Sequence, residues 1–264
     1  MKINDIIDCL EAIAPPHLQE SYDNSGLITG DKNRDVTGVL VCLDSTPEVI
    51  EEAVEKGCNL VIAHHPIIFS GLKQITGANY IERTVIAAIK NDVAIYAIHT
   101  NLDNVLSKGV NGKIAQRLGL KNCSPLKPMD PVTNPDLGAG VIGELDNPMS
   151  EEAFLGHLKS SMKVEVIRHT RMLGGEVRKV AVCGGSGSFL LSHAISQGAE
   201  VFVTGDFKYH QFFDADDKIV IADIGHYESE QFTVDLICEL ITEKFPNFAP
   251  DSSKRGSNPI IYYT

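Results

Sequence analysis

The sequence lacks any apolar run long enough to cross a membrane. A transmembrane helix needs about 18 or more consecutive apolar residues, and no segment of this 264-residue chain approaches that length. The first 14 residues have the apolar spacing of a helix but carry Asp5, Asp8 and Glu11, so they do not match a signal peptide. We therefore expect a cytoplasmic protein with no membrane partner.

Positive charge is scarce, and so are paired cysteines. The chain has 23 Lys and Arg residues against 35 Asp and Glu residues, which gives a formal net charge of -12. Non-specific nucleic-acid binding needs a basic surface, so we expect none, although a metal site could still accept a nucleotide substrate.

None of the six cysteines forms a CxxC pair, and most lie in apolar segments, which predicts reduced structural thiols.

Two adjacent histidines give the strongest functional signal in the chain. His64 and His65 follow the apolar run 60–63, and Pro66 comes directly after them. Successive side chains of a strand point to opposite faces, so two imidazoles at a strand tip can aim at two neighbouring points. Packing alone does not explain such a pair, whereas two closely spaced metal ions would use it.

Three further residues of metal-ligating type follow other apolar runs. Asp103 comes after the run 93–98, and His226 and Glu230 come after the run 219–224. His226 and Glu230 are four residues apart and would share one face at the start of a helix. Mixed imidazole and carboxylate ligands suit Zn, Mn, Fe, Co or Ni better than Ca. The sequence thus predicts two divalent metal ions per chain, without naming the metal.

The chain repeats part of itself. Residues 36–65 align without gaps with residues 177–206, with seven identities in thirty positions. Each copy has the pattern of a strand, a polar turn, a helix, a glycine and a second apolar strand. In the first copy Thr46 can cap the helix, Pro47 can occupy its first turn, and Gly57 can end it.

This alternation of strands and helices predicts an α/β fold with largely parallel sheets. We expect two related α/β domains from an internal duplication, formed by residues 1–125 with 246–264 and by residues 126–245. Because ligands of such sheets bind beyond the carboxyl ends of the strands, the metal site should lie in a cleft between the domains. The stretch 122–148 is rich in Pro, Gly, Asn and Asp and is predicted to be linker and irregular structure.

Five short motifs occur in an order known from one protein family. They are Tyr-Asp-Asn-Ser-Gly-Leu (22–27), Ala-His-His-Pro-Ile-Ile-Phe (63–69), His-Thr-Asn-Leu-Asp (99–103), Thr-Gly-Asp-Phe-Lys-Tyr-His (204–210), and Gly225-His226 with Glu230. On these motifs the chain resembles the Ngg-interacting-factor family, whose bacterial, YbgI-like members are often labelled GTP cyclohydrolase I type 2 homologues. The resemblance covers most of the chain and is weakest over residues 122–171.

The resemblance implies a metal-ligand set and an assembly. By it, His64 and His226 would bind one ion, His65 and Asp103 would bind the other, and Glu230 would bridge the two. The position between two cations suits a carboxylate, whose charge offsets their repulsion. The family also forms toroidal homohexamers with the sites facing an internal cavity, so self-association is the partnership we expect, beside a small-molecule substrate.

Three residues near these motifs are candidate catalytic residues for proton transfer: His99, Asp206 and His210. His99 lies on the same segment as Asp103 and could instead orient a metal ligand or simply end a strand. Asp206 takes the repeat position of His65, and His210 follows it closely.

Two turns have open interpretations. Asp23 and Asn24 are turn formers that could also belong to the site. The glycine-rich stretch 184–188 precedes a helix and is either an anion cradle or a structural turn.

The pattern as a whole favours metal-assisted hydrolysis, in which two divalent ions activate a water molecule. Opening of a purine imidazole ring, as in GTP cyclohydrolase chemistry, is one such reaction. The alternative is a non-catalytic metal-binding scaffold or metal-handling protein, and the substrate is not readable from the sequence.

Overall fold

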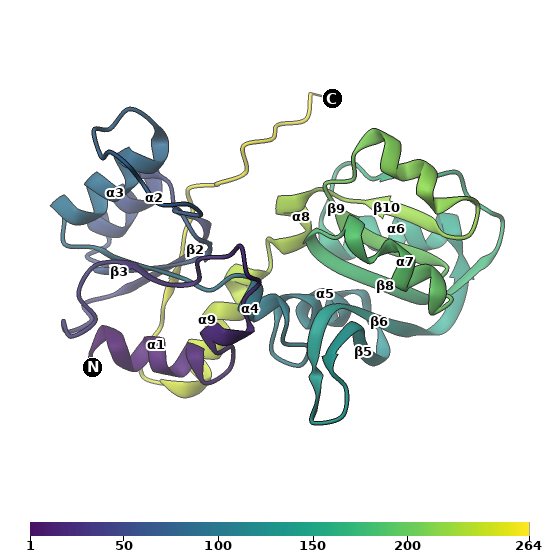
Figure 1. Ribbon diagram of the computed structural model, residues 1–264, viewed down its shortest axis with the longest axis horizontal. Coiled ribbons are helices and arrows are strands. Elements are labelled where there is room, and N and C mark those ends of the chain that lie inside the picture. Colours follow the sequence, from purple (N-terminus) through teal and green to yellow (C-terminus); the bar gives the residue numbers. More distant parts are fainter. Residues whose placement is uncertain (264) are drawn as a thin grey trace. The chain divides into compact units, whose positions relative to one another are not determined.

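The computed structural model describes residues 1–263 and shows a mixed α/β fold with two sheets (Figure 1). The chain divides into two compact units. Unit 1 comprises Met1–Leu102 together with the chain from Thr233 onward, and unit 2 comprises Asp103–Phe232. These boundaries lie earlier than the sequence-based ones, because the helix at 110–118 packs on the second sheet and the helix at 233–244 on the first.

The sheet of unit 1 has three parallel strands at its centre. Its order is β1 (Gly26–Thr29), β4 (Ala94–Ala97), β3 (Leu60–His65), β2 (Val39–Asp44) and β11 (Asp251–Ser252). β2, β3 and β4 run parallel to one another, and β11 adds in parallel to β2, whereas β1 is antiparallel to β4. The carboxyl ends of β2 and β3 therefore meet at the same edge, where Asp44 is in register with His65.

Helices of unit 1 form where the sequence places capping residues. The hydroxyl of Thr46 accepts a hydrogen bond from the Val49 N–H at 3.4 Å at the start of α2 (Pro47–Glu55), and Gly57 beyond its end has φ +69°. The predicted cap and glycine stop are thus confirmed. The other helices are α1 (Ile3–Glu11), α3 (Tyr80–Lys90), α9 (Thr233–Lys244), the short α4 (Thr100–Asp103) and the 3₁₀ turn η1 (Pro16–Leu18).

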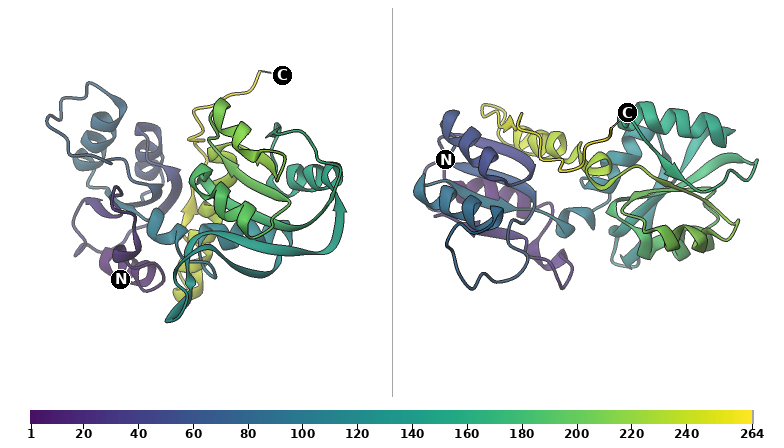
Figure 2. Two further views of the ribbon diagram at one scale, coloured as in Figure 1. Left: turned by 45° about the vertical axis from the view of Figure 1, so that its right-hand side comes forward. Right: turned by 90° about the horizontal axis from the view of Figure 1, so that it is seen from above.

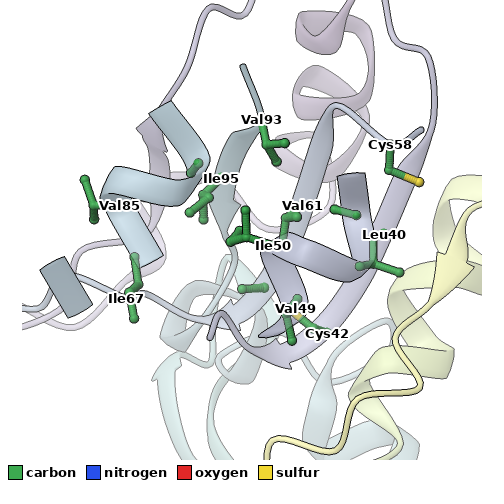
Figure 3. Close-up of a cluster of buried hydrophobic side chains, with 13 residues drawn as sticks. Leu40, Cys42, Val49, Ile50, Cys58, Val61, Ile67, Val85, Val93 and Ile95 are labelled. Atoms are coloured by element: carbon green, nitrogen blue, oxygen red, sulfur yellow. The ribbon is translucent and has the colours of Figure 1, made fainter. Parts of the chain in front are cut away.

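The core of unit 1 joins the sheet to α2 and α3 (Figure 3). Alternate residues of β2 and β3, such as Leu40 and Val61, point to the same layer as Ile50 of α2 and Val85 of α3. Burying each such aliphatic side chain contributes roughly 1.5–3 kcal/mol. This layer gives the strand ends that carry His64 and His65 a rigid base.

The sheet of unit 2 is mixed. Its order is β5 (Lys121–Asp130), β6 (Asn134–Ser150), β8 (Glu176–Ser186), β9 (Val201–Gly205), β10 (Val220–Asp223) and β7 (Arg168–His169). β8, β9 and β10 are parallel, and the remaining pairings are antiparallel. The prediction of linker and irregular structure over 122–148 was wrong, because β5 and the greater part of β6 form a long hairpin there.

Helices cover both faces of this second sheet (Figure 2). α6 (Glu151–Met162) lies on one face, and α7 (Leu191–Ser196) lies on the other, over a core that includes Ala194, Phe202 and Phe207. The remaining elements are α5 (Val110–Leu118), α8 (His226–Glu230) and two 3₁₀ segments, η2 (Ser188–Leu190) and η3 (Tyr209–Ala215). No helix among the described residues is long and apolar enough to span a membrane.

Candidate metal centre

Three histidines gather at the carboxyl edge of the unit 1 sheet. His64 and His65 end β3, and His99 follows β4, the next strand in the sheet. Their ring centroids are 4.9–5.2 Å apart, and one ring nitrogen of each lies within 4.8 Å of the others. His64 is buried, and the other two are only slightly exposed. The structure therefore brings together the histidine pair and one of the candidate catalytic residues.

Each of these rings is held through its Nδ1 atom by an oxygen. The Nδ1 of His64 bonds the Ile98 carbonyl at 2.8 Å, and the Nδ1 of His65 bonds the Asp44 carboxylate at 2.7 Å. The Nδ1 of His99 bonds the Asp23 carboxylate at 2.8 Å. An acceptor at Nδ1 places the ring proton there and makes Nε2 the atom that can ligate a metal, as in most protein metal sites.

Asp23 lies behind His99 as a fully buried carboxylate. It also accepts hydrogen bonds from the Thr100 N–H at 3.0 Å, from the Thr100 hydroxyl at 2.5 Å, and from the Asn24 N–H at 2.7 Å. Burial opposes the charge, but these bonds and His99 together outweigh it and lower the pKa of Asp23. Asp23 thus fixes the orientation of the His99 ring, and through the Asn24 N–H it also stabilises its own turn.

Asp44 was missed by the sequence analysis. Its burial favours the neutral acid, yet the hydrogen bond and charge of His65, together with a bond from Ser257, lower the pKa of the Asp44 carboxyl. A signal was available, because Asp44 ends the strand that aligns with β3 in a parallel sheet. Recognising it required the register of the two strands.

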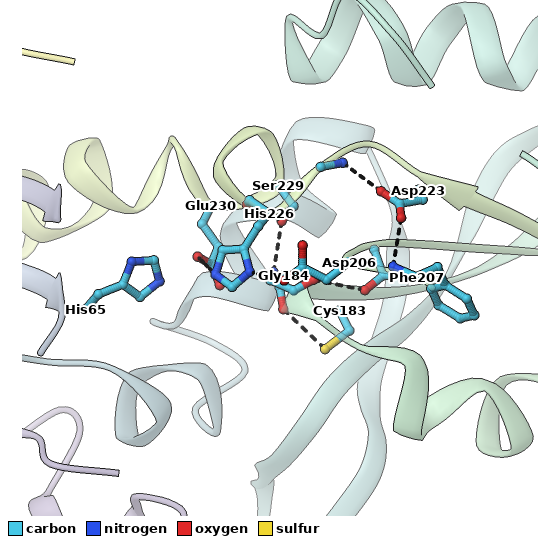
Figure 4. Close-up of polar contacts among 12 residues, drawn as sticks. His65, Cys183, Gly184, Asp206, Phe207, Asp223, His226, Ser229 and Glu230 are labelled. Carbon is cyan, nitrogen blue, oxygen red and sulfur yellow. Dashed lines mark hydrogen bonds and ion pairs between the residues drawn. The ribbon is translucent and has the colours of Figure 1, made fainter. Parts of the chain in front are cut away.

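A second group of ligand-type residues lies in unit 2 (Figure 4). The Nδ1 of His226 bonds the Asp206 carboxylate at 2.7 Å, and its Nε2 lies 3.2 Å from the Glu230 carboxylate. Glu230 is buried, and carboxylate oxygens of Asp103 and Glu230 lie within 4.8 Å of each other. Asp206 therefore orients His226 in the way that Asp44 orients His65.

The glycine-rich turn at 184–188 makes room for Glu230. A Cβ atom at Gly185 would lie 2.4 Å from Glu230 Oε1, and Gly185 also has φ +62°. The N–H groups of Gly184 and Gly185 donate to Asn111 Oδ1 and Ser229 Oγ, each at 2.9 Å. These bonds support the structural-turn interpretation, since they direct the backbone donors to the protein itself.

A buried carboxylate, Asp223, fixes the two turns that carry Asp206 and His226. It accepts a hydrogen bond from the Phe207 N–H at 2.8 Å (Figure 4) and another from the Gly225 N–H at 3.0 Å, and it pairs with Arg168. Asp223 was not among the predicted site residues, because in the sequence it is simply the polar residue at the end of an apolar strand.

His210, the third candidate catalytic residue, is placed differently from the other two. It lies on η3, and its ring contacts are with Tyr209 and Phe213, at centroid distances of 5.1 and 6.5 Å. Among the described residues, His210 belongs to none of the groups of side chains whose ligand atoms lie close enough together to hold a metal ion.

Comparison with known proteins shows the family of the chain. A family model described as Duf34/NIF3 (NGG1p interacting factor 3) matches residues 1–256. The chain belongs to this family. A Clostridium perfringens protein named GTP cyclohydrolase 1 type 2 homolog is 37% identical over 245 residues, with 92% of each chain covered.

Solved structures of the family share the fold over the whole chain. A Staphylococcus aureus hypothetical protein has a TM-score of 0.92 at 34% identity, covering 100% of this chain and 99% of its own. A Bacillus cereus protein related to NIF3 has a TM-score of 0.91 at 28% identity, with the same coverage. The architecture of two sheets is therefore that of the NIF3 superfamily.

The donor set of this family member fits a divalent transition metal. In unit 2, His226 faces a carboxylate with each ring nitrogen, so a neutral ring has a proton for only one of them. A cation beside Nε2 would satisfy both the ring and Glu230, and would also offset the repulsion between Asp103 and Glu230. Burial, with the charges of Asp103 and Glu230, raises the pKa of the Cys183 thiol, so this cysteine is a poor ligand at neutral pH.

Proposed function

We propose that the protein is a dinuclear-metal-dependent hydrolase of a small molecule. In this proposal His64 and His65 of unit 1 and Asp103, His226 and Glu230 of unit 2 hold two divalent ions in a cleft between the units. One observation carries it: all three ligand histidines bond an oxygen through Nδ1, which directs Nε2 to ligation. Packing alone gives no reason for the same pattern in two histidines at the end of β3 and a third beyond the end of β10.

Two bound cations would supply Lewis-acid chemistry and activate water for hydrolysis. The residues of the chain would then orient the substrate and move protons. His99 is the best-placed base, because Asp23 keeps the ring proton on Nδ1 and leaves Nε2 to accept another. Asp206 acts on His226 as a positioning residue, and a catalytic role for His210 needs a substrate that reaches η3.

The names of the relatives suggest a substrate class to test. Curated relatives carry the name GTP cyclohydrolase 1 type 2 homolog, and ring opening of a purine is a hydrolysis that an activated water can perform. We propose GTP cyclohydrolase-like chemistry as one reaction to test first, beside a wider screen of small molecules.

A non-catalytic role in metal binding is the second candidate. His64 and Glu230 are both buried, which suits tight retention of a metal as much as access for a substrate. A metal-handling protein would bind and release ions without turning over any compound.

We also propose a common origin for the two units and a symmetric assembly. Both β2–α2–β3 and β8–α7–β9 order a strand, a helix and a parallel strand, and their sequences share the seven identities. The family resemblance supports a toroidal homohexamer, which native mass spectrometry would reveal. The six free cysteines fit a reducing compartment such as the cytoplasm.

The deciding experiment is a substrate screen on metal-reconstituted protein. A hydrolase should turn over at least one compound, GTP included, and lose that activity in Glu230→Gln and His65→Ala while circular dichroism shows an unchanged fold. If the reconstituted protein binds metal but hydrolyses nothing, the non-catalytic role is supported instead.

A further inference from the structure

Unit 2 contains a cavity at the edge of its sheet that β7 forms. It has a volume of about 680 Å³ and lies between η3 and the segment that begins with the edge strand β7. Cavities that hold small ligands typically measure roughly 300–1,000 Å³ and are lined by apolar and aromatic side chains with a few polar groups. Leu173, Phe212 and Ile219 supply part of the apolar lining here.

One wall of this cavity is aromatic and exposed. The side chains of Tyr209 and Phe213 are 73% and 68% exposed, and their ring centroids lie 5.7 Å apart. Both come from η3 and line the cavity together with Phe212. Gathered aromatic side chains at the mouth of a cavity indicate a binding surface, because leaving apolar area in water is unfavourable.

Two arginines stand at the same cavity. The guanidinium carbon of Arg168 lies 5.5 Å from the ring centroid of Phe212, and Arg171 lies three residues further along the chain. Arg168 uses its Nη2 to bond Asp223 and the Phe207 carbonyl, so the planar group is fixed by a buried carboxylate. Its Nε and Nη1 donors make no bond to the described residues and can serve a ligand.

The charges around the cavity balance one another. Asp216 pairs with Lys218, Asp217 pairs with Arg171, and Arg168 pairs with Asp223. The region is thus locally neutral, although the whole chain carries a net charge of -12. A neutral region with fixed guanidinium donors suits one anionic group, whereas a polyphosphate would need a net positive site.

We propose that this cavity binds a planar aromatic ring that bears a single anionic group. The ring packs against Phe213 and Tyr209, and the anion accepts hydrogen bonds from Arg168. Stacking between aromatic rings contributes roughly 0.5–1.5 kcal/mol beyond area burial, and a guanidinium bonds a carboxylate or sulfonate in its own plane. The site does not depend on the metal proposal, since none of these residues is a proposed metal ligand.

Isothermal titration calorimetry with three probes tests the proposal on the full chain. Naphthalene-2-sulfonate combines a planar ring with one negative charge, 2-naphthalenemethanol lacks the charge, and cyclohexanesulfonate lacks the planar ring. We expect naphthalene-2-sulfonate to bind at one site per chain. The other two probes should bind at least about tenfold more weakly, which corresponds to about 1.4 kcal/mol of binding free energy.

Two variants locate the site. Phe213→Ala removes an exposed ring, so it should weaken the binding of naphthalene-2-sulfonate about tenfold without loss of fold. Phe69→Ala removes a comparably exposed ring in unit 1 and should leave this affinity unchanged. Arg168→Lys keeps the charge beside Asp223 but removes the planar donors. It should weaken the binding of naphthalene-2-sulfonate more than that of the uncharged 2-naphthalenemethanol. Equal binding of the neutral probe, or full affinity in Phe213→Ala, would overturn the proposal.

Discussion

Asp44 and His65 are joined by a 2.7 Å hydrogen bond between Oδ1 and Nδ1, at register-matched ends of two parallel strands. The same kind of bond recurs between Asp206 Oδ2 and His226 Nδ1 in unit 2, again at 2.7 Å, although these two residues lie beyond the ends of β9 and β10. Each carboxylate fixes the tautomer and the direction of a histidine that lies far from it in the sequence. Two of the proposed metal ligands, His65 and His226, are therefore each oriented by a particular carboxylate.

Asp44→Asn should weaken metal binding without unfolding the protein. An amide can present its N–H₂ group to Nδ1, which would move the ring proton to Nε2 and block ligation. Loss of such a supporting carboxylate typically costs about 10–100-fold in metal affinity. Calorimetric titration with Zn²⁺ measures the change, and Asp31→Asn, an exposed turn residue, is the control that should bind normally.

Glu230→Gln and Asp103→Asn should differ in the number of ions lost. If Glu230 bridges, its replacement removes the charge that holds two cations together, so both ions should be depleted and any hydrolysis abolished. Asp103→Asn should deplete mainly one ion. Elemental analysis counts the ions that each variant retains, and circular dichroism checks that the fold is unchanged. Equal single-ion losses in the two variants would show that Glu230 does not bridge.

Gly185→Ala should damage both stability and metal binding. The added methyl would meet Glu230 Oε1 at 2.4 Å, at a residue whose φ of +62° already disfavours side chains. The backbone strain alone costs roughly 1–3 kcal/mol, and the displaced carboxylate should lower metal occupancy. Gly156→Ala is the matched control, because the methyl meets nothing within 4 Å in α6 and alanine favours the helix, so thermal unfolding should shift slightly upward.

Unit 1 should lose stability in acid through Glu52. Burial opposes its charge, but hydrogen bonds from Ser253, from the N–H groups of Lys254 and Arg255, and from Lys56 lower the pKa of Glu52 from 4.5 to about 2. A depressed pKa stabilises the folded state above the unfolded value, and this contribution disappears as the pH falls from 4.5 through about 2.

Urea unfolding at several pH values tests this account of Glu52. The difference in free energy of unfolding between the wild type and Glu52→Gln should be largest near neutral pH and shrink across that acid window. A difference that stays constant with pH would contradict it.

Part of this architecture was readable from the sequence because local signals agreed. The apolar run before His64 set the strand, Thr46 and Pro47 set the start of α2, and Gly57 followed its end. Asp44 and Asp223 could not be found this way. Their roles depend on which strands are neighbours, and nothing local distinguishes either residue from other acidic residues at strand ends.

The stretch 122–148 was misread because its composition is typical of loops. Pro125 and Pro128 lie on β5, the edge strand, where a missing N–H is tolerated. Gly138 sits where a Cβ would lie 2.4 Å from the Lys127 carbonyl oxygen, so only glycine allows the strands to approach. The composition that suggested a linker thus fits a hairpin with an edge strand and closely packed strands.

The metal content of the reconstituted protein decides whether the centre is dinuclear. After incubation with a divalent transition metal and removal of excess ions, inductively coupled plasma mass spectrometry should find about two ions per chain. Replacement of His65 by alanine should reduce that number. One ion or fewer per chain in the wild type, with the fold intact, would contradict the account.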